Sequence, residues 1–409
     1  MLQRRARRSR AVPVALSAGI LLAQTFAAAP LADPLGAPLP ERLRLVLPWS
    51  YLLAAPLFTL WDGVSMLSMH RLEGFLAGLA LLYLLARVGL GLLRRRASPR
   101  GELVSLLLAL AGLAAFIAAG VLWHRPMARL AGVSADEAVV DFHTHTRASH
   151  DVGGTLMDGY DAAANLAWHR RAGFDAAFLT DHNTVTRATD PAPGIRPCPG
   201  IEVSAWRAHV LLLGDTAAVD RTRYNRDLAG LLDLLQTSER EYGALTVASS
   251  PEYARNHWGR LDTLVAAGLD GFEIVNAAPK ANELSRARRD TVVALARRTG
   301  RFVIGVSDHH GWGATSMVWN LVAVPGWRRT PDRLCGGILD RLREGGIGAA
   351  RIVERHRLRP DDRWPHLLTP VGVVWETWRG MGIGAAVAWV GWVWGVWLVA
   401  GWRRRLSSP

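Results

Sequence analysis

The stretch Asp141-Phe142-His143-Thr144-His145, directly after the apolar run Ala138-Val139-Val140, decides the fold. Alternate residues of a strand project to the same side, so His143 and His145 are expected to point two imidazoles at one place. A lone histidine is usually a surface residue or a satisfied core residue. This pair instead stands at the end of a run that is typical of a buried strand. We therefore interpret it as the start of a metal site.

The same arrangement of an apolar run followed by polar side chains recurs further along the chain. Asp308 and His310 form a second pair at positions i and i+2, after the run Phe302 to Val306. More histidines and carboxylates lie between the two pairs, namely His150, Asp151, His182, Glu202, His209 and Glu273. Imidazole and carboxylate together are ligands for Zn, Mn or Fe. This many of them predicts more than one ion.

Short apolar runs alternate with helix-like stretches between residues 138 and 344. The predicted strands are 138–140, 176–179, 210–213, 245–248, 271–275 and 302–306, and the predicted helices are 162–172, 227–242, 261–267, 282–298 and 331–344. Alternation of this kind predicts parallel β/α units. Barrel enzymes build their sites at the C-terminal ends of such strands, where most of the candidate ligands fall. The fold class is therefore predicted to be α/β.

The ordered motifs resemble a known family. His-x-His, Ser-His-Asp, Thr-Asp-His, Gly-Ile-Glu, a lone His, Glu-x-x-Asn and Ser-Asp-x-His, between residues 138 and 312, are similar to those of the PHP (polymerase and histidinol phosphatase) family. The resemblance implies a distorted (β/α)7 barrel with a two- or three-metal phosphoesterase site. It implies His143, His145, Glu202 and Asp308 around one ion, Glu202 bridging to a second ion with His209, and Asp151, His182 and His310 around a third. Asp151 is preferred to His150 because it has the family's ligand spacing.

The sequence departs from the family at one position. The family has a His-Pro pair after the middle strand, whereas this chain has Ser250-Pro251. Three interpretations stay open: a weaker second ion, no second ion, or a replacement ligand from His257. Because a ligand is lost, the alternative that this chain is a non-catalytic binding or sensing module also stays open. An amidohydrolase-like metal hydrolase is a further alternative, but it requires a bridging lysine, and the only lysine of the chain, Lys280, lies outside such a pattern.

The predicted chemistry is hydrolysis of a phosphate ester by a metal-activated water. Glu202 is the predicted bridging carboxylate of the catalytic centre. Arg255, together with Arg207 and Lys280, is a candidate to clamp phosphate oxygens. His257 is a candidate proton donor to the leaving group, with His309 as the other choice.

Composition predicts a membrane protein. The chain has 409 residues, is 50% hydrophobic and carries a net charge of +13. Its arginines cluster at Arg4 to Arg10, Arg94 to Arg100 and Arg403 to Arg405, each beside an apolar stretch, which indicates membrane flanks rather than a nucleic-acid-binding motif. The two cysteines, Cys198 and Cys335, imply no disulfide framework. The oligomeric state cannot be read from the sequence.

Four apolar stretches are predicted to span the bilayer: 11–29, 72–93, 103–123 and 381–402. The stretch Leu45 to Trp61 contains Pro48 and Pro56, and it either spans or lies at the interface. If it does not span, all three arginine clusters fall in the cytoplasm and the barrel lies outside, as the positive-inside rule favours. The predicted organisation is a membrane region over 1–123, a metal-dependent barrel over 136–358, a linker over 359–380 and a C-terminal transmembrane helix over 381–402.

Overall fold

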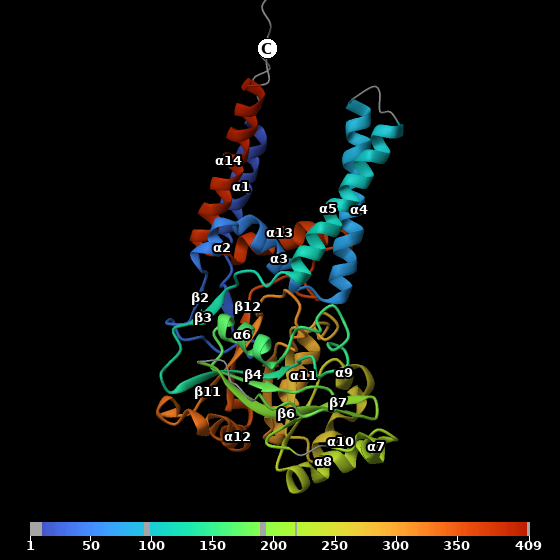
Figure 1. Cartoon of the computed structure of the whole chain (residues 1–409), viewed down its shortest axis with the longest axis vertical. Helices are drawn as coiled ribbons and strands as arrows, with labels where there is room; N and C mark the ends of the chain where they lie inside the picture. Colours follow the sequence, from blue (N-terminus) through green and yellow to red (C-terminus); the bar gives the residue numbers. More distant parts are fainter. Residues whose placement is uncertain (1–9, 94–98, 189–193, 217–218, 407–409) are drawn as a thin grey trace, which may run out of the picture.

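The protein has two regions in the computed structural model, which describes residues 10–93, 99–188, 194–216 and 219–406. Figure 1 shows a sheet surrounded by helices in the lower half and long helices that rise from it in the upper half. Short helices lie crosswise between the two regions. The chain is therefore a mixed α/β unit joined to a helical region on one side only.

A curled sheet of ten strands forms the centre of the lower region, in the order β1-β12-β11-β4-β5-β6-β7-β8-β9-β10. Its strands are β1 (Leu31–Ala32), β4 (Glu137–Thr144), β5 (Ala176–Leu179), β6 (Arg196–Ala205), β7 (Ala208–Leu213), β8 (Leu245–Ala248), β9 (Gly271–Asn276), β10 (Phe302–Val306), β11 (Val318–Ala323) and β12 (Ala350–Arg355). The sheet curls so far that the segment after β10 hydrogen-bonds to the end of β4, through Asp308 N to His143 O at 2.9 Å and His145 N to His309 O at 3.0 Å. The residues that follow β4 and β10 are thus brought side by side.

Helices cover the outside of the curled sheet. They are α6 (Ala162–Ala172), α7 (Arg221–Tyr224), α8 (Leu228–Tyr242), α9 (Glu252–Asn256), α10 (Leu261–Ala266), α11 (Arg286–Thr299) and α12 (Leu334–Gly345). Side-chain caps define several ends: Asp161, Asp227 and Ser285 cap the starts of α6, α8 and α11. Glycines with positive φ end the same three helices. The predicted helices agree with these elements to within a few residues.

The sheet is not the regular parallel β/α series that the sequence pattern predicts. β4, β5 and β6 are parallel, as are β8, β9 and β10, but β7 is antiparallel to both of its neighbours. β6 and β7 form a hairpin whose turn residues, Trp206 and Arg207, have φ of 21° and 59°, as a tight hairpin turn requires. β11 and β12 add an antiparallel extension beside β4. The predicted set of strands lacks four strands of this sheet, β1, β6, β11 and β12.

The upper region consists of two helix pairs. The first pair is α1 (Ala11–Thr25) with α14 (Ile383–Leu406), and the second is α4 (Met69–Leu93) with α5 (Pro99–Leu122). Three helical segments are long and apolar enough to cross a membrane: Met69–Gly89, Pro99–Leu122 and Ile383–Trp402. α1 is apolar but has only 15 residues in the described part of the chain, about 22 Å of helix. All four helices leave the α/β region from the same side (Figure 1).

The stretch from Leu45 to Trp61 is broken into short elements. Leu45 lies in β2 (Arg44–Val46), which pairs with β3 (Arg129–Ala131), and the rest forms α2 (Trp49–Leu53) and α3 (Ala55–Ser65). Pro48 and Pro56 fall at the start of α2 and in the first turn of α3, where proline is tolerated. With α13 (Thr369–Gly380), these helices lie across the base of the upper region (Figure 1). No single helix covers this stretch.

A buried ionic cluster joins the two regions. Asp62 of α3 binds Arg125, which follows α5, at 2.6 Å and Arg355 at the end of β12 at 2.9 Å, and it accepts a hydrogen bond from the Tyr51 hydroxyl at 2.8 Å. The Asp62 and Arg125 side chains are almost fully buried. Paired and hydrogen-bonded charges of this kind are costly to separate, so the cluster fixes the crosswise helices against the sheet.

Cys198 of β6 and Cys335 of α12 form a disulfide, with Cα atoms 5.6 Å apart. The sequence implied no disulfide framework, and the structure adds a finding that the sequence did not predict, namely one bond between the two cysteines. The residues are 137 positions apart, and only the packing of α12 on the sheet brings them together.

Candidate metal centre

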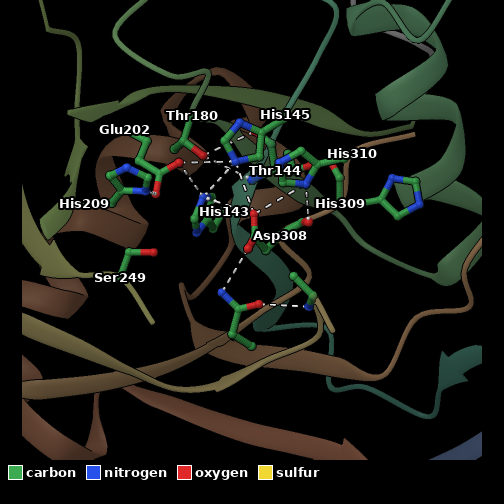
Figure 2. Close-up of polar contacts among 12 residues, drawn as sticks. His143, Thr144, His145, Thr180, Glu202, His209, Ser249, Asp308, His309 and His310 are labelled. Carbon is green, nitrogen blue, oxygen red and sulfur yellow. Dashed lines mark hydrogen bonds and ion pairs between the residues drawn. The ribbon is translucent and has the colours of Figure 1, made fainter. Parts of the chain in front are cut away.

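The candidate ligands gather at the rim of the sheet where several strands end. His143 is the penultimate residue of β4 and His145 follows that strand, while His182 lies three residues beyond the end of β5. Glu202 and His209 project from the β6–β7 hairpin, and Asp308 follows β10. Figure 2 shows the side chains of His143, His145, Glu202, His209 and Asp308 gathered in one place. The curl of the sheet is what brings the β4 and β10 ends into contact.

Thr180, directly after β5, ties the end of that strand to the end of β4. Its hydroxyl accepts a hydrogen bond from Thr144 N at 3.1 Å. Further along the same segment, His182 forms an isolated bridge with Glu202 of β6. These contacts place the His182 ring beside the β4 histidines.

The first group of ligand atoms comprises His143, His145 and Asp308. The two Nε2 atoms lie 2.9 Å apart, and Oδ1 of Asp308 lies 3.4 Å from the first and 3.1 Å from the second. Oε2 of Glu202 faces the same place, 3.1 Å from His143 Nε2 and 3.3 Å from His145 Nε2. Two nitrogens and two carboxylate oxygens therefore face one point.

Two further groups share residues with the first. One comprises His145, Asp151, His182 and His310, and the other comprises His182, Glu202 and His209. Oδ2 of Asp151 lies 2.9 Å from His310 Nε2 and 3.2 Å from His182 Nε2. Within the last group, Oε1 of Glu202 faces His209 Nδ1 at 3.1 Å and Oε2 faces His182 Nδ1 at 3.1 Å, and Oε2 also faces His143 Nε2 of the first group at 3.1 Å. Glu202 is thus positioned to bridge.

The donor set fits divalent metal ions. Ligands about 2.1 Å from a tetrahedral ion lie about 3.4 Å from one another, close to the separations in the first group. His143, His145 and Glu202 are at most 2% exposed. Oδ1 of Asp151 is buried without a hydrogen-bond partner among the described residues, and so is Nδ1 of His182 despite its closeness to Glu202. Buried ionisable groups this close together are costly unless something binds them, and a metal ion would do so.

Hydrogen bonds from outside the cluster orient the histidine rings. Nδ1 of His143 faces Oε1 of Glu273 at 2.7 Å, and Nδ1 of His145 faces the Ser149 hydroxyl at 3.1 Å. Nδ1 of His310 donates to the Asp308 carbonyl at 2.8 Å. Each contact leaves Nε2 directed at the cluster. Partners of this kind fix the tautomer of a metal-binding histidine.

The charges of the cluster shift its pKa values in opposite directions. Burial alone would lower the pKa of His143, but Asp308, Glu202 and other nearby carboxylates raise it well above its ordinary value. Burial and the neighbouring His310 lower the pKa of His145 to about 4. Against the effect of burial, hydrogen bonds to carboxylates raise the pKa values of His209 and His310 to about 9. Carboxylates and protonated imidazoles therefore neutralise one another when no metal is bound.

Three candidate histidines belong to none of the three ligand groups, although the ring centroids of His150 and His182 lie 5.0 Å apart. The His257 ring faces the Trp206 carbonyl through Nε2 at 3.2 Å and belongs to none of the three groups. The His309 ring points away from the other histidines, as Figure 2 shows, and stacks on Trp168 with ring centroids 4.0 Å apart. His150 is exposed. These positions give none of the three histidines a ligand role.

The predicted phosphate-clamping residues are exposed. Arg255 of α9 donates a hydrogen bond to the Lys280 carbonyl at 3.1 Å, and Arg207 lies in the β6–β7 turn. The Arg207, Arg255 and Lys280 side chains are all exposed. The Lys280 side chain is thus exposed rather than buried among the ligand atoms.

Ser250, at the position of the family histidine, is buried beside the cluster. Its backbone N–H donates to Oε2 of Glu273 at 2.9 Å, and its hydroxyl donates to the Ala281 carbonyl at 3.4 Å. The side chain is therefore directed towards Ala281 rather than towards His209. No described residue takes the place of the missing imidazole in the group around Glu202 and His209.

The sequence offered Glu273 as a candidate metal ligand and assigned no role to Asn276, Ser149 or Glu252, although all four residues act on the cluster. Glu273 and Asn276 form the Glu-x-x-Asn motif; Glu273 faces His143, and Nδ2 of Asn276 donates to Oδ2 of Asp308 at 3.2 Å. Ser149 belongs to the Ser-His-Asp motif. Glu252, at the start of α9, lies close enough to His209 for their charges to interact, and burial raises its pKa. The motifs of the sequence could have identified Glu273, Asn276 and Ser149 as residues of the site, but no motif contains Glu252.

Comparison with known proteins gives only distant matches. No family model and no curated protein matches the chain. The solved structure of PsfC from Pseudomonas syringae PB-5123 is 18% identical, with a TM-score of 0.37 over 59% of this chain and 96% of PsfC. A candidate metal-dependent phosphoesterase from Bifidobacterium adolescentis ATCC 15703 is 16% identical, with a TM-score of 0.29 over 42% of this chain and 88% of that protein. Likeness at this level does not indicate an activity for this chain.

Proposed function

We propose that this chain is a membrane-anchored, metal-dependent phosphoesterase of the PHP type. The observation that carries the proposal is the sharing of ligands: His145 and His182 each belong to two groups of donor atoms, and Glu202 of the third group also faces His143 of the first at 3.1 Å. Shared ligands hold ions close together, and paired ions suit phosphate-ester hydrolysis. The residues proposed to hold two or three divalent ions are His143, His145, Asp151, His182, Glu202, His209, Asp308 and His310.

Bound ions would supply a nucleophilic water at neutral pH and would offset the charge of the phosphate oxygens. The protein side chains have separate tasks. In the proposed reaction, oxygen from water adds to phosphorus while the bond from phosphorus to the ester oxygen breaks. Arg255 and Arg207, both exposed near the cluster, bind the phosphate oxygens. Glu252 gives a proton to the leaving oxygen, a role that its raised pKa favours.

We further propose that the α/β region lies outside the cytoplasm. α1, α14 and the α4–α5 hairpin point away from the sheet, so the far ends of these helices share one side. The arginine clusters adjoin those ends in the sequence; residues 4–9 and 94–98 lie outside the described residues, as do the side chains of 403–405. The positive-inside rule assigns that side to the cytoplasm. The Cys198–Cys335 disulfide also supports an oxidising compartment.

The test uses the full chain, purified in detergent, because the α/β region packs on the membrane helices through Asp62. Metal content is measured first, and then hydrolysis of p-nitrophenyl phosphate and of bis(p-nitrophenyl) phosphate. The double variant His143→Ala/His145→Ala should lose most of the metal and at least about a thousandfold in rate, since the ions supply several kcal/mol. His150→Ala, an exposed histidine nearby, is the control. Equal metal content in the double variant and the wild type would refute the assignment.

A further inference from the structure

We propose that a second, arginine-rich pocket between the sheet and the crosswise helix α13 binds the phosphate group of an anionic ligand. The cavity has a volume of about 800 Å³, within the usual range of ligand pockets. None of the eight proposed metal ligands lines it. It is therefore a separate site, and the proposal does not depend on the phosphoesterase activity.

Three elements supply the arginines of this pocket. Arg289 comes from α11, Arg357 and Arg359 come from the segment after β12, and Arg379 comes from α13. Arg71 of α4 fixes the middle element, because it donates hydrogen bonds to the carbonyls of Arg359 at 3.2 Å and Trp364 at 2.8 Å. The pocket is thus built where the membrane helices meet the α/β region.

Positive charge around the pocket exceeds negative charge. The Glu354 carboxylate, 1% exposed, faces three guanidinium groups: Arg359 at 2.7 Å, Arg357 at 3.0 Å and Arg289 at 3.8 Å. Two carboxylates that line the pocket have partners of their own, since Asp362 binds Arg286 at 2.6 Å and Glu376 binds Arg379 at 2.9 Å. One buried carboxylate is therefore shared among three arginines.

Two other carboxylates lie near Arg289, and neither balances the excess. Asp290 lies 3.8 Å from the Arg289 guanidinium, but its side chain is 71% exposed, so solvent screens its charge. Asp33 lines the pocket and accepts a hydrogen bond from Leu35 N at 2.7 Å; even when it is ionised, Asp33 and Glu354 together carry fewer charges than the three guanidinium groups. Like charges held together in a buried place repel one another unless a counter-charge is present. An anion in the pocket would provide that counter-charge.

Two of the arginines have buried hydrogen-bond donors without a partner among the described residues. Nη1 of Arg357 and Nε of Arg289 are buried and make no hydrogen bond with any described residue. The Arg357 side chain is 7% exposed and that of Arg289 is 11% exposed, so water does not readily satisfy these atoms. A guanidinium group has five N–H donors in a planar fork that matches phosphate oxygens. The unsatisfied donors therefore point to a phosphate rather than to a second carboxylate of the protein.

Two sources of phosphate fit this position. The segment between the pocket and the membrane helices carries exposed apolar side chains, Leu367, Leu368 and Val371, next to the arginines. A lipid headgroup would reach the arginines from this side with its acyl chains against the apolar residues. A free phosphate ester would enter from the solvent. Both present the same group to the pocket arginines.

The experiment measures thermal unfolding of the full chain in nanodiscs, with a chelator present so that the metal centre does not contribute. Nanodiscs of phosphatidylcholine alone, the same with added inorganic phosphate, and nanodiscs that contain phosphatidylglycerol are compared. Arg357→Gln is the main variant and Arg289→Gln is the second, in case the first does not fold. Arg298→Gln is the matched control, because Arg298 lies on α11, does not line the pocket and is 61% exposed.

We expect phosphatidylglycerol or phosphate to raise the unfolding temperature of the wild type and of Arg298→Gln. In Arg357→Gln, the concentration of phosphate or phosphatidylglycerol that gives half of this rise in unfolding temperature should be about tenfold to a hundredfold higher than in the wild type. This is the effect expected when a hydrogen bond to a charged group is lost. A response to phosphatidylglycerol alone would identify a lipid headgroup, and a response to phosphate in phosphatidylcholine would identify a soluble ester; each supports the pocket. A pocket variant that responds like the wild type, or a wild type that responds to neither anion, would overturn it.

Discussion

Nδ1 of His143 lies 2.7 Å from Oε1 of Glu273, while Nε2 of the same ring lies 3.1 Å from Oε2 of Glu202. The His143 ring therefore lies between two carboxylates, Glu273 at Nδ1 and Glu202 at Nε2, which have different roles. Glu273 accepts the Nδ1 proton and so keeps Nε2 available as a ligand. Glu273 is fully buried in β9, and its other oxygen accepts hydrogen bonds from Ser250 N and Asn276 Nδ2.

The first prediction concerns Glu273. Glu273→Gln should lower the metal affinity about tenfold to a hundredfold, because an amide holds the His143 Nδ1 proton less firmly than a carboxylate does. Titration of the metal-free protein measures the change. Glu239→Gln, on the exposed side of α8, is the control and should bind metal as the wild type does. An unchanged affinity in Glu273→Gln would mean that Glu273 does not orient the ring.

The second prediction concerns pH. The pKa values of His209 and His310 are raised to about 9 from an ordinary value of 6.5. In the metal-free protein their charged pairs contribute stability that is fully present below about pH 6.5 and is lost as the pH rises through about 9. Metal ions compete with these protons, so metal affinity should rise over the same range.

Two measurements between about pH 6.5 and pH 9 check this prediction. One is the stability of the metal-free protein in the presence of a chelator, and the other is the metal affinity by titration. His310→Gln removes one of the two groups and should make both profiles less steep. A metal affinity that is constant over this range would contradict the raised pKa values.

The convergence of the candidate ligands could be predicted from the sequence because these residues lie at regular places. His143 and His145 are two positions apart at a strand end, so the period of the strand alone predicts their convergence. Glu202 and His209 were harder to place, because they lie on the β6–β7 hairpin rather than at the ends of parallel strands. The turn at Trp206 and Arg207 has no glycine, and nothing in the composition marks it as a hairpin. Motif order assigned these two residues where periodicity did not.

The third prediction concerns Ser250 and His257. The Ser250 hydroxyl faces Ala281, beside a cavity of only about 10 Å³. Ser250→His should therefore lower the free energy of unfolding by about 1–3 kcal/mol through overpacking, without raising the metal content. His257→Ala should leave the metal content unchanged, since the ring faces the Trp206 carbonyl. Higher metal occupancy in Ser250→His, or metal loss in His257→Ala, would show that the group around Glu202 and His209 needs a further imidazole.

The fourth prediction concerns the disulfide between β6 and α12. The double variant Cys198→Ala/Cys335→Ala should lose about 2–5 kcal/mol of stability, because the bond closes a loop between residues 137 positions apart. Thermal unfolding with and without a reductant measures the loss. The reductant should destabilise the wild type and leave the variant unaffected. Equal stability of the two proteins without reductant would show that packing alone holds α12. The sequence could not predict this bond, because the distance between the cysteines depends on the whole sheet.

The last prediction concerns orientation. If the α/β region lies outside the cytoplasm, a cysteine introduced at Asp262, whose side chain is 79% exposed, should react with a membrane-impermeant maleimide in intact cells. The native cysteines form a disulfide and give no background. A green fluorescent protein fused after the C-terminus should fluoresce, because α14 runs away from the α/β region. Labelling of Asp262→Cys only after the cells are permeabilised would place the region inside. That result would leave the metal centre and the arginine pocket unaffected, since neither depends on which side of the membrane the sheet lies.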